Sequence, residues 1–255
     1  MKTWLTAVTL TLAAVGAQAQ AADPLKAAVA ADNRLVGNVA RDAWRHPYET
    51  LSFFGIKPTD TVVELAPGGG WYTEILAPYL RDAGQLYAAD GGSARFKAKM
   101  ESMGVYAKVK ITAFDANKGL LDIAPAGTAD AVLTFRNVHN WMGSGKAQDV
   151  FNAAFKALKP GGVLGVEEHR LPASRPQDPK APSGYVHEAT VIKFAEAAGF
   201  KLAGRSEVNA NPKDTADHPE GVWTLPPTYA LKDKDRAKYQ AIGESDRMTL
   251  KFVKP

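Results

Sequence analysis

The chain has 255 residues, of which 45% are hydrophobic and 23% are charged, and its formal net charge is +4. These values are ordinary for a soluble globular protein and allow one α/β domain with a full core. The charge is small and the sequence has no arginine-rich arm or basic stripe, so no nucleic-acid partner is indicated. Because cysteine is absent, disulfides, thiolate catalysis and cysteine-bound zinc are excluded.

Residues 1–21 have the organisation of a cleavable signal peptide. Lys2 provides a positive start and residues 4–15 form an apolar stretch. Two small-x-small cleavage sites follow, ending at Ala19 and Ala21. The apolar stretch is too short for a comfortable membrane span. We therefore expect cleavage near Ala19 or Ala21 and a periplasmic or secreted product without a stable membrane anchor.

Helix and strand patterns alternate along residues 22–255, which we expect to form one domain. Its first part, residues 22–55, is predicted to be helical: an Ala-rich segment runs from Pro24 to Trp44, and a second helix from Pro47 to Phe54 ends at Gly55. Strands are expected at 61–65, 85–89, 107–113, 129–135, 163–166, from 200, and at 248–253, and helices at 73–80, 93–103, 148–158 and 187–198. This alternation predicts the α/β class: a doubly wound, mostly parallel seven-stranded sheet with an N-terminal helical extension.

A long polar segment, residues 209–243, precedes the last predicted strand. It contains four prolines and Trp223. Segments of this length inside a compact domain usually have a function. We therefore expect an insertion that forms a lid over the site.

The run from Val62 to Thr73 is typical of a cofactor-binding loop. An apolar strand containing Glu64 leads through three glycines, residues 68–70, into a helix. Backbone without side chains lets a ligand approach closely, and the following helix N-terminus directs N–H groups toward it. Thr73 stands where a nicotinamide-binding motif has its third glycine, which disfavours a nicotinamide oxidoreductase.

This loop resembles the first motif of the class I S-adenosylmethionine-dependent methyltransferases. Glu64, Gly68 and Gly70 match that motif, and Ala66 stands where the family commonly has its first glycine. The resemblance implies that these four residues bind the cofactor S-adenosyl-L-methionine, with Trp71 packed beside it. Glu64 has a second interpretation, in which backbone N–H groups of the loop satisfy its carboxylate without a ligand.

Later landmarks extend the resemblance to about residues 45–205. Asp90 ends the second strand, where the family has an acid that accepts hydrogen bonds from the ribose hydroxyls. Asp115 ends the third strand, where the family contacts the adenine amino group, although both acids also fit ordinary turns. The turn Lys159-Pro-Gly-Gly162 precedes the fifth strand, and Arg136 after the fourth is a further expected cofactor-binding residue.

Four short segments narrow the resemblance. They are Arg45-His-Pro47, Phe53-Phe-Gly55, Pro67-Gly-Gly-Gly-Trp-Tyr72 and Phe135-Arg-Asn-Val-His-Asn-Trp141. These segments are similar to a small bacterial branch of predicted methyltransferases that carry signal peptides. The methyl acceptor is not implied by this similarity.

Candidate catalytic residues follow strands four and five, where open α/β sheets bind their ligands. Three of the five histidines, His139, His169 and His187, belong to this rim. Methyl transfer needs a base when the nucleophile carries a proton, so His139 is the first candidate, His169 the second, and Glu168 an orienting carboxylate. Helix capping is an equal interpretation at His187 and Glu188. No metal is expected, because the sequence has no H-x-x-x-H or H-E-x-x-H pair.

Two functions are compatible with these features. The first is an exported S-adenosylmethionine-dependent methyltransferase acting on a small molecule or an envelope component. The second is a non-catalytic binding protein that retains the fold and an adenosyl-ligand pocket. Retention of Glu64, Asp90 and Asp115 favours the enzyme, whereas export favours the binding protein because the methyl donor is made in the cytoplasm. Neither interpretation fixes the oligomeric state.

Overall fold

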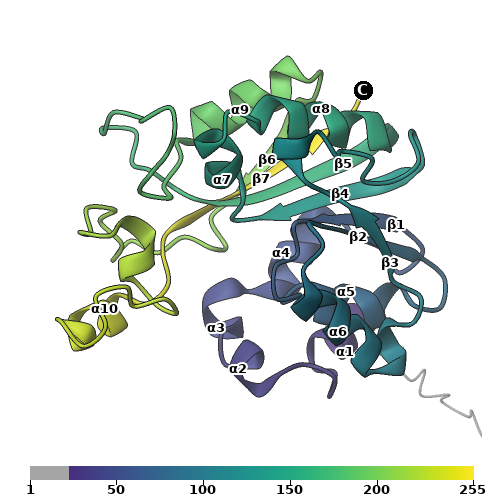
Figure 1. Cartoon of the computed structure of the whole chain (residues 1–255), viewed down its shortest axis with the longest axis horizontal. Helices are drawn as coiled ribbons and strands as arrows, with labels where there is room; N and C mark the ends of the chain where they lie inside the picture. Colours follow the sequence, from purple (N-terminus) through teal and green to yellow (C-terminus); the bar gives the residue numbers. More distant parts are fainter. Residues whose placement is uncertain (1–22) are drawn as a thin grey trace, which may run out of the picture.

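A seven-stranded sheet forms the centre of the molecule (Figure 1). The computed structural model describes residues 23–255, so the expected signal peptide lies outside the described residues. The strands lie in the order β3-β2-β1-β4-β5-β7-β6, and β7 is antiparallel to both of its neighbours while the other adjacent pairs are parallel. The α/β, doubly wound, mostly parallel fold is thereby confirmed. The strands are β1 (Thr61–Leu65), β2 (Gln85–Asp90), β3 (Lys110–Ala113), β4 (Ala129–Phe135), β5 (Leu158–His169), β6 (Lys201–Ser206) and β7 (Arg247–Val253).

Helices cover both faces of the sheet (Figure 1). Successive side chains of a strand point to opposite faces, so Val62 packs into the hydrophobic cluster beneath α4, α5 and α6, while Val63 packs into the one beneath α7, α8 and α9. The N-terminal helices α1, α2 and α3 lie on the side of α5. The helices are α1 (Pro24–Val29), α2 (Val36–Val39), α3 (Asp42–Arg45), α4 (Pro47–Phe54), α5 (Thr73–Leu80), α6 (Ala94–Ser102), α7 (Val138–Gly143), α8 (Ala147–Ala157), α9 (Glu188–Ala197) and α10 (Arg236–Ile242), with short 3-10 turns η1 (Gly104–Tyr106), η2 (Ala116–Lys118) and η3 (Gly221–Thr224).

The Ala-rich segment does not form one continuous helix. It divides into α1, α2 and α3 because tertiary contacts hold the intervening turns. The buried carboxylate of Glu74 on α5 accepts hydrogen bonds from Leu35 N (3.3 Å) and Asn38 Nδ2 (3.0 Å). Arg34 joins Val29 O to the carboxylate of Asp42. Glu74 is distant in sequence from both of its partners, so the local helix pattern does not reveal these contacts.

Strand β5 is longer than predicted and includes the segment Lys159–Gly162, which the sequence suggested was a tight turn. Gly161 N donates to Lys254 O at 2.8 Å, and Lys254 N donates to Gly162 O at 2.9 Å. The end of the chain therefore continues the sheet along this segment, a partner that local turn chemistry cannot indicate.

Residues 209–243 are anchored to the body of the domain by Asp214. Its buried carboxylate accepts hydrogen bonds from Tyr185 Oη (2.9 Å) and Asp246 N (2.8 Å), and pairs with His218 Nε2 (2.8 Å). The segment includes η3 and α10 and forms a wall of a cavity described below, while its action as a lid stays a prediction. Across the described residues, no helix combines the length and apolar character needed to span a bilayer.

Candidate functional site

The glycine loop between β1 and α5 faces open space. Ala66, Gly68 and Gly70 all have left-handed backbone, with φ of 48°, 58° and 74°. A side chain at Gly68 or Gly69 would meet no atom within 4 Å, whereas one at Gly70 would press on Phe96 at 3.1 Å. The loop lines a cavity of about 310 Å³ together with α2, α3 and the end of β4. Exposed backbone of this kind is what a closely approaching ligand requires.

Glu64 lies under this loop and is fully enclosed. Its Oε2 accepts a hydrogen bond from Thr73 Oγ1 at 2.5 Å. Burial raises the pKa of Glu64 to about 7, and the Thr73 hydroxyl opposes that rise. The carboxyl is therefore satisfied mainly by a side chain of α5, and its contact with a ligand stays a prediction.

Asp90 and Asp115 lie at the same edge of the sheet but differ in surroundings. Asp90 is only 7% exposed, and its Oδ2 accepts from Gly92 N (2.9 Å) and Ser93 N (2.7 Å). Both of these bonds reach one oxygen, so Oδ1 is left to accept from a ligand. Asp115 caps η2 and pairs with Lys118 Nζ at 3.0 Å, which lowers its pKa. The ligand contacts expected of both acids stay predictions.

Trp71 and Arg136 line the same cavity as the glycine loop. The Trp71 indole donates to Asn38 O at 3.1 Å and lies 4.8 Å from the guanidinium of Arg45. Arg136 has left-handed backbone, with φ of 61°, although it is not glycine. Its N–H donates to Glu167 O at 2.7 Å and its Nη1 to Glu167 Oε1 at 3.1 Å, which together hold this strained residue in place.

The three expected catalytic residues are brought together at the ends of β4 and β5. His139 Nδ1 lies 3.0 Å from Glu168 Oε1, and Glu168 also accepts from the backbone N–H groups of His139 (3.2 Å) and His169 (2.8 Å). Because Glu168 accepts, the proton of neutral His139 is assigned to Nδ1, which leaves Nε2 as a base. The rings of His139 and His169 are 5.5 Å apart, and Trp223 packs edge-on to His139 at 5.8 Å.

His169 lines a second cavity of about 210 Å³. Its Nδ1 lies 2.5 Å from Ser245 Oγ. Burial lowers the pKa of His169 well below its usual value, and the neighbouring His139 and Arg136 lower it further, so His169 is neutral at physiological pH. His139 Nδ1 faces a carboxylate, whereas His169 Nδ1 faces a hydroxyl group.

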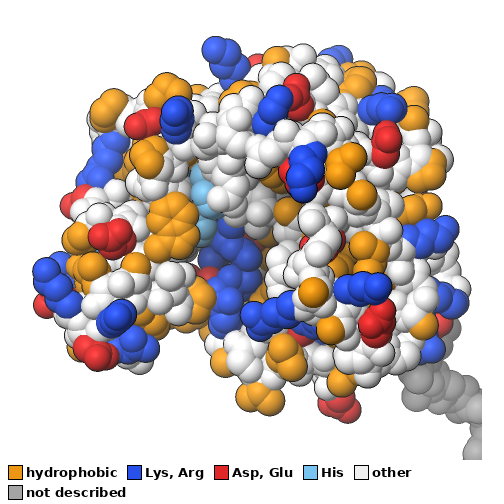
Figure 2. Space-filling view, in the orientation of Figure 1, with side chains coloured by type: hydrophobic (Ala, Val, Ile, Leu, Met, Phe, Trp, Pro, Cys, Tyr) orange, Lys and Arg blue, Asp and Glu red, His pale blue; other side chains and the backbone are white. Residues whose placement is uncertain are grey.

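Three arginines line both cavities: Arg41, Arg45 and Arg136. Figure 2 shows basic side chains (blue) deep in a hollow of the molecule, beside histidine (pale blue). Arg41, Arg45 and the buried Glu244 were not predicted from the sequence to be site residues. Arg45 belongs to the segment Arg45-His-Pro47, which resembles the methyltransferase branch. No local pattern in the sequence indicates Arg41 or Glu244, which lie about 200 positions apart in the chain.

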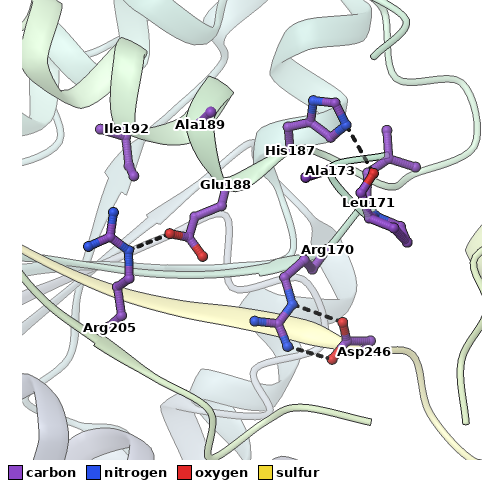
Figure 3. A pocket seen from close by; sticks show the side chains of 10 residues that line it. Arg170, Leu171, Ala173, His187, Glu188, Ala189, Ile192, Arg205 and Asp246 are labelled. Carbon is purple, nitrogen blue, oxygen red and sulfur yellow. Dashed lines mark hydrogen bonds and ion pairs between the residues drawn. The ribbon is translucent and has the colours of Figure 1, made fainter. Parts of the chain in front are cut away.

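His187 does not join the histidine cluster. It lines a separate cavity of about 610 Å³, where its Nε2 lies 3.2 Å from Pro172 O (Figure 3). The charged side chains there are already paired, Arg170 with Asp246 at 2.8 Å and Arg205 with Glu188 at 2.5 Å. This larger cavity therefore offers less uncompensated chemistry than the two that share the arginines.

His139, Glu168 and His169 also have potential ligand atoms within 4.8 Å of one another. The sequence spacing gave no sign of this cluster. Both imidazole Nδ1 atoms already have partners in Glu168 and Ser245, and the positive charge of Arg136 acts on His169. A divalent cation would meet that same repulsion, and the expectation that no metal binds here stays a prediction.

Comparison with known proteins shows similarity at the level of structure. No family model and no curated protein sequence matches the chain. An S-adenosylmethionine-dependent methyltransferase from Aquifex aeolicus is 18% identical, with 91% of this chain and 99% of that one aligned and a TM-score of 0.59. The [4+2]-cyclase SpnF is 16% identical, with 91% and 92% aligned and a TM-score of 0.60. A phosphoethanolamine N-methyltransferase from Haemonchus contortus, solved with S-adenosylmethionine, is 16% identical, with 83% and 53% aligned and a TM-score of 0.54. Together with the strand order, these matches show that the chain has the fold of the class I S-adenosylmethionine-dependent methyltransferases.

Proposed function

We propose that this protein is an exported S-adenosylmethionine-dependent methyltransferase that acts on a small molecule or an envelope component. The observation that carries the proposal is the buried His139–Glu168 pair, 3.0 Å apart, which supplies a candidate base with a carboxylate partner. It lies at the carboxyl ends of β4 and β5, the edge of the sheet at which the glycine loop follows β1. Ligands of open α/β sheets bind at this edge.

The residues of the first cavity suit the methyl donor. When bound, S-adenosylmethionine supplies a methyl group already activated on a sulfonium. The open backbone of Gly68 and Gly69 would lie against it, with Trp71 beside it. The Oδ1 atom of Asp90 would accept hydrogen bonds from the ribose hydroxyls, and Asp115 would contact the adenine amino group. The solved relative from Haemonchus contortus binds the same donor in its structure.

The second cavity would hold the acceptor. His139 would take a proton at Nε2 from the nucleophile, and Glu168 would stabilise the imidazolium that forms. His169 would contact the acceptor as a neutral side chain, and Trp223 would exclude water from the pair. Orientation of the acceptor supplies most of the remaining acceleration, up to about 7–11 kcal/mol in favourable cases.

A binding protein without methyl-transfer activity is the second candidate. The match to SpnF, which is a cyclase, is compatible with it, because that protein shows that the fold does not by itself imply methyl transfer. The expected export also supports it, since residues 1–21 would carry the protein away from the compartment that makes the donor. Both candidates require an adenosyl ligand at the glycine loop.

Calorimetry with the mature protein tests the common requirement. We expect S-adenosylmethionine and S-adenosylhomocysteine to bind, and Asp90→Ala to weaken both by at least about tenfold, since about 1.4 kcal/mol of hydrogen bonding is lost. The control Asp122→Ala changes an exposed acid that pairs with Lys156 at 3.5 Å, and this variant should bind normally. Absence of binding to the wild-type protein would overturn both candidates. Binding without methyl transfer across amines, phenols and thiols would favour the binding protein.

Export is tested separately by N-terminal sequencing of the protein recovered from the producing cells. Cleavage near Ala19 or Ala21 is expected. An uncleaved chain would contradict the proposed location without bearing on the chemistry.

A further inference from the structure

The arginines shared by the two cavities have more hydrogen-bond donors than the protein uses. Arg41 Nε donates to Glu244 Oε1 at 2.6 Å, and Arg45 Nε donates to Glu244 Oε2 at 3.2 Å. Arg136 Nη1 donates to Glu167 Oε1 at 3.1 Å. Among residues 23–255, no other side-chain hydrogen bond is made by these three guanidinium groups, although each carries five N–H donors. All three arginines line both cavities.

The direct ion pairs of these arginines are also unequal in number, and burial raises the pKa of Glu64, a further acid that acts on Arg136, to about 7. Arg247 lies beneath the same cluster, where it pairs with Glu167 at 3.0 Å and with Glu244 at 2.8 Å. Four guanidinium groups therefore share two buried carboxylates. Arg45 is only 4% exposed, and burial together with the charge of Arg136 lowers the pKa of Arg45 to about 9. Buried cations in excess of their counter-ions are costly unless a ligand supplies the missing negative charge.

The methyl donor does not supply it. S-adenosylmethionine has a sulfonium and an ammonium against one carboxylate, so its net charge is positive. Even if one arginine binds that carboxylate, the cavity as a whole becomes more positive when the donor is bound. The compensating negative charge would then come from the second ligand of the reaction, the methyl acceptor.

We propose that the methyl acceptor carries an anionic group, a carboxylate or a phosphate, which Arg41, Arg45 and Arg136 bind. The proposal rests on the proposed function and adds the substrate class. Planar guanidinium groups match both anions through paired N–H donors. Because His169 borders the same cavity as the three arginines, an acceptor held by its anion would present its nucleophile toward His169, whose ring lies 5.5 Å from that of His139.

Calorimetry and thermal unfolding with inorganic phosphate and with acetate test the proposal, at constant ionic strength in chloride. Wild-type protein saturated with S-adenosylhomocysteine should bind phosphate and show a higher Tm, because a ligand of the folded state raises stability. Arg45→Met should weaken phosphate binding about tenfold, equal to one lost charge-assisted contact. Arg205→Met is the matched control, because that arginine lies in the separate cavity of Figure 3.

The outcomes separate the two proposals. Binding of S-adenosylhomocysteine without binding of phosphate or acetate would overturn the anionic acceptor and leave the proposed function standing. Competition between phosphate and S-adenosylhomocysteine would also overturn it, because the arginines would then serve the donor's carboxylate. Equal loss of phosphate binding in Arg45→Met and Arg205→Met would show unspecific attraction and count against the site. Binding of phosphate without binding of S-adenosylhomocysteine would instead contradict the proposed methyltransferase function.

Discussion

The hydroxyl of Thr73 donates a 2.5 Å hydrogen bond to the carboxyl of Glu64, and both side chains are buried. The bond joins the first residue of α5 to β1 and so connects the two ends of the glycine loop. The same threonine disfavoured a nicotinamide site, because it replaces the glycine that allows close helix packing there. In this fold its hydroxyl has a different role, as a hydrogen-bond donor to a buried acid.

The wild-type protein should lose stability as the pH rises from 5 to 8, and Glu64→Gln should lose less over the same range. The pKa of Glu64 is about 7 in the folded protein and 4.5 as its ordinary value, so its contribution is full below pH 4.5 and is lost as the pH rises through 7. That difference corresponds to at most about 3 kcal/mol. Urea unfolding at both pH values measures it. Glu101→Gln, at an exposed position of α6, is the control, and an unchanged pH dependence in Glu64→Gln would contradict the expectation.

Ala66→Gly should stabilise the protein slightly. Ala66 has a φ of 48°, and left-handed backbone costs a residue with a side chain about 1–2 kcal/mol. Glycine removes that cost but gives the unfolded chain about 0.4–1 kcal/mol of extra entropy, so a net gain of about 0.5 kcal/mol is expected. Ala98→Gly, on the exposed face of helix α6, should instead lose about 1 kcal/mol. A loss of similar size at both positions would show that Ala66 is not strained.

His139→Asn and Glu168→Gln should interact strongly in a double-mutant cycle. Their bond is buried, and Glu168 also holds two backbone N–H groups, so removing either partner leaves polar groups unsatisfied. We expect a coupling in the free energy of unfolding of about 1–2 kcal/mol. The exposed pair Arg205–Glu188 should give less than about 1 kcal/mol. Additive losses at the buried pair would show that the histidine is not oriented by the carboxylate.

His169 should remain neutral at pH values where an ordinary histidine is protonated. Its pKa is lowered well below 6.5 by burial first, so the folded state opposes protonation and stability falls as the pH drops below about 6.5. An NMR titration of the imidazole protons, assigned with His169→Asn, measures the midpoint. The same variant should lose less stability than the wild-type protein between pH 7 and pH 5. A midpoint at or above 6.5 would contradict the buried, arginine-flanked position.

The sequence predicted the sheet well because its strands are recognisable locally. The ranges 61–65, 73–80 and 129–135 agree with β1, α5 and β4, where β-branched runs and flanking glycines mark the ends. It predicted β5 and the N-terminal helices less well. The segment Lys159–Gly162 is ordered by the chain end, and α1 to α3 are separated by contacts to Glu74, so in both cases the deciding partner is far away in sequence.

The order of residues by itself determined the α/β class, the glycine loop and the positions of Asp90, His139 and Glu168 at strand ends, because periodicity and turn chemistry act between near neighbours. Only the tertiary structure decided that His139 pairs with Glu168 while His187 stands apart. The tertiary structure also brings Arg41 and Arg45, at helix α3, next to Arg136, at the end of β4. These arginines pair with the carboxylates of Glu244 and Glu167. Electrostatic balance is a property of distances in space, and no spacing along the chain records it.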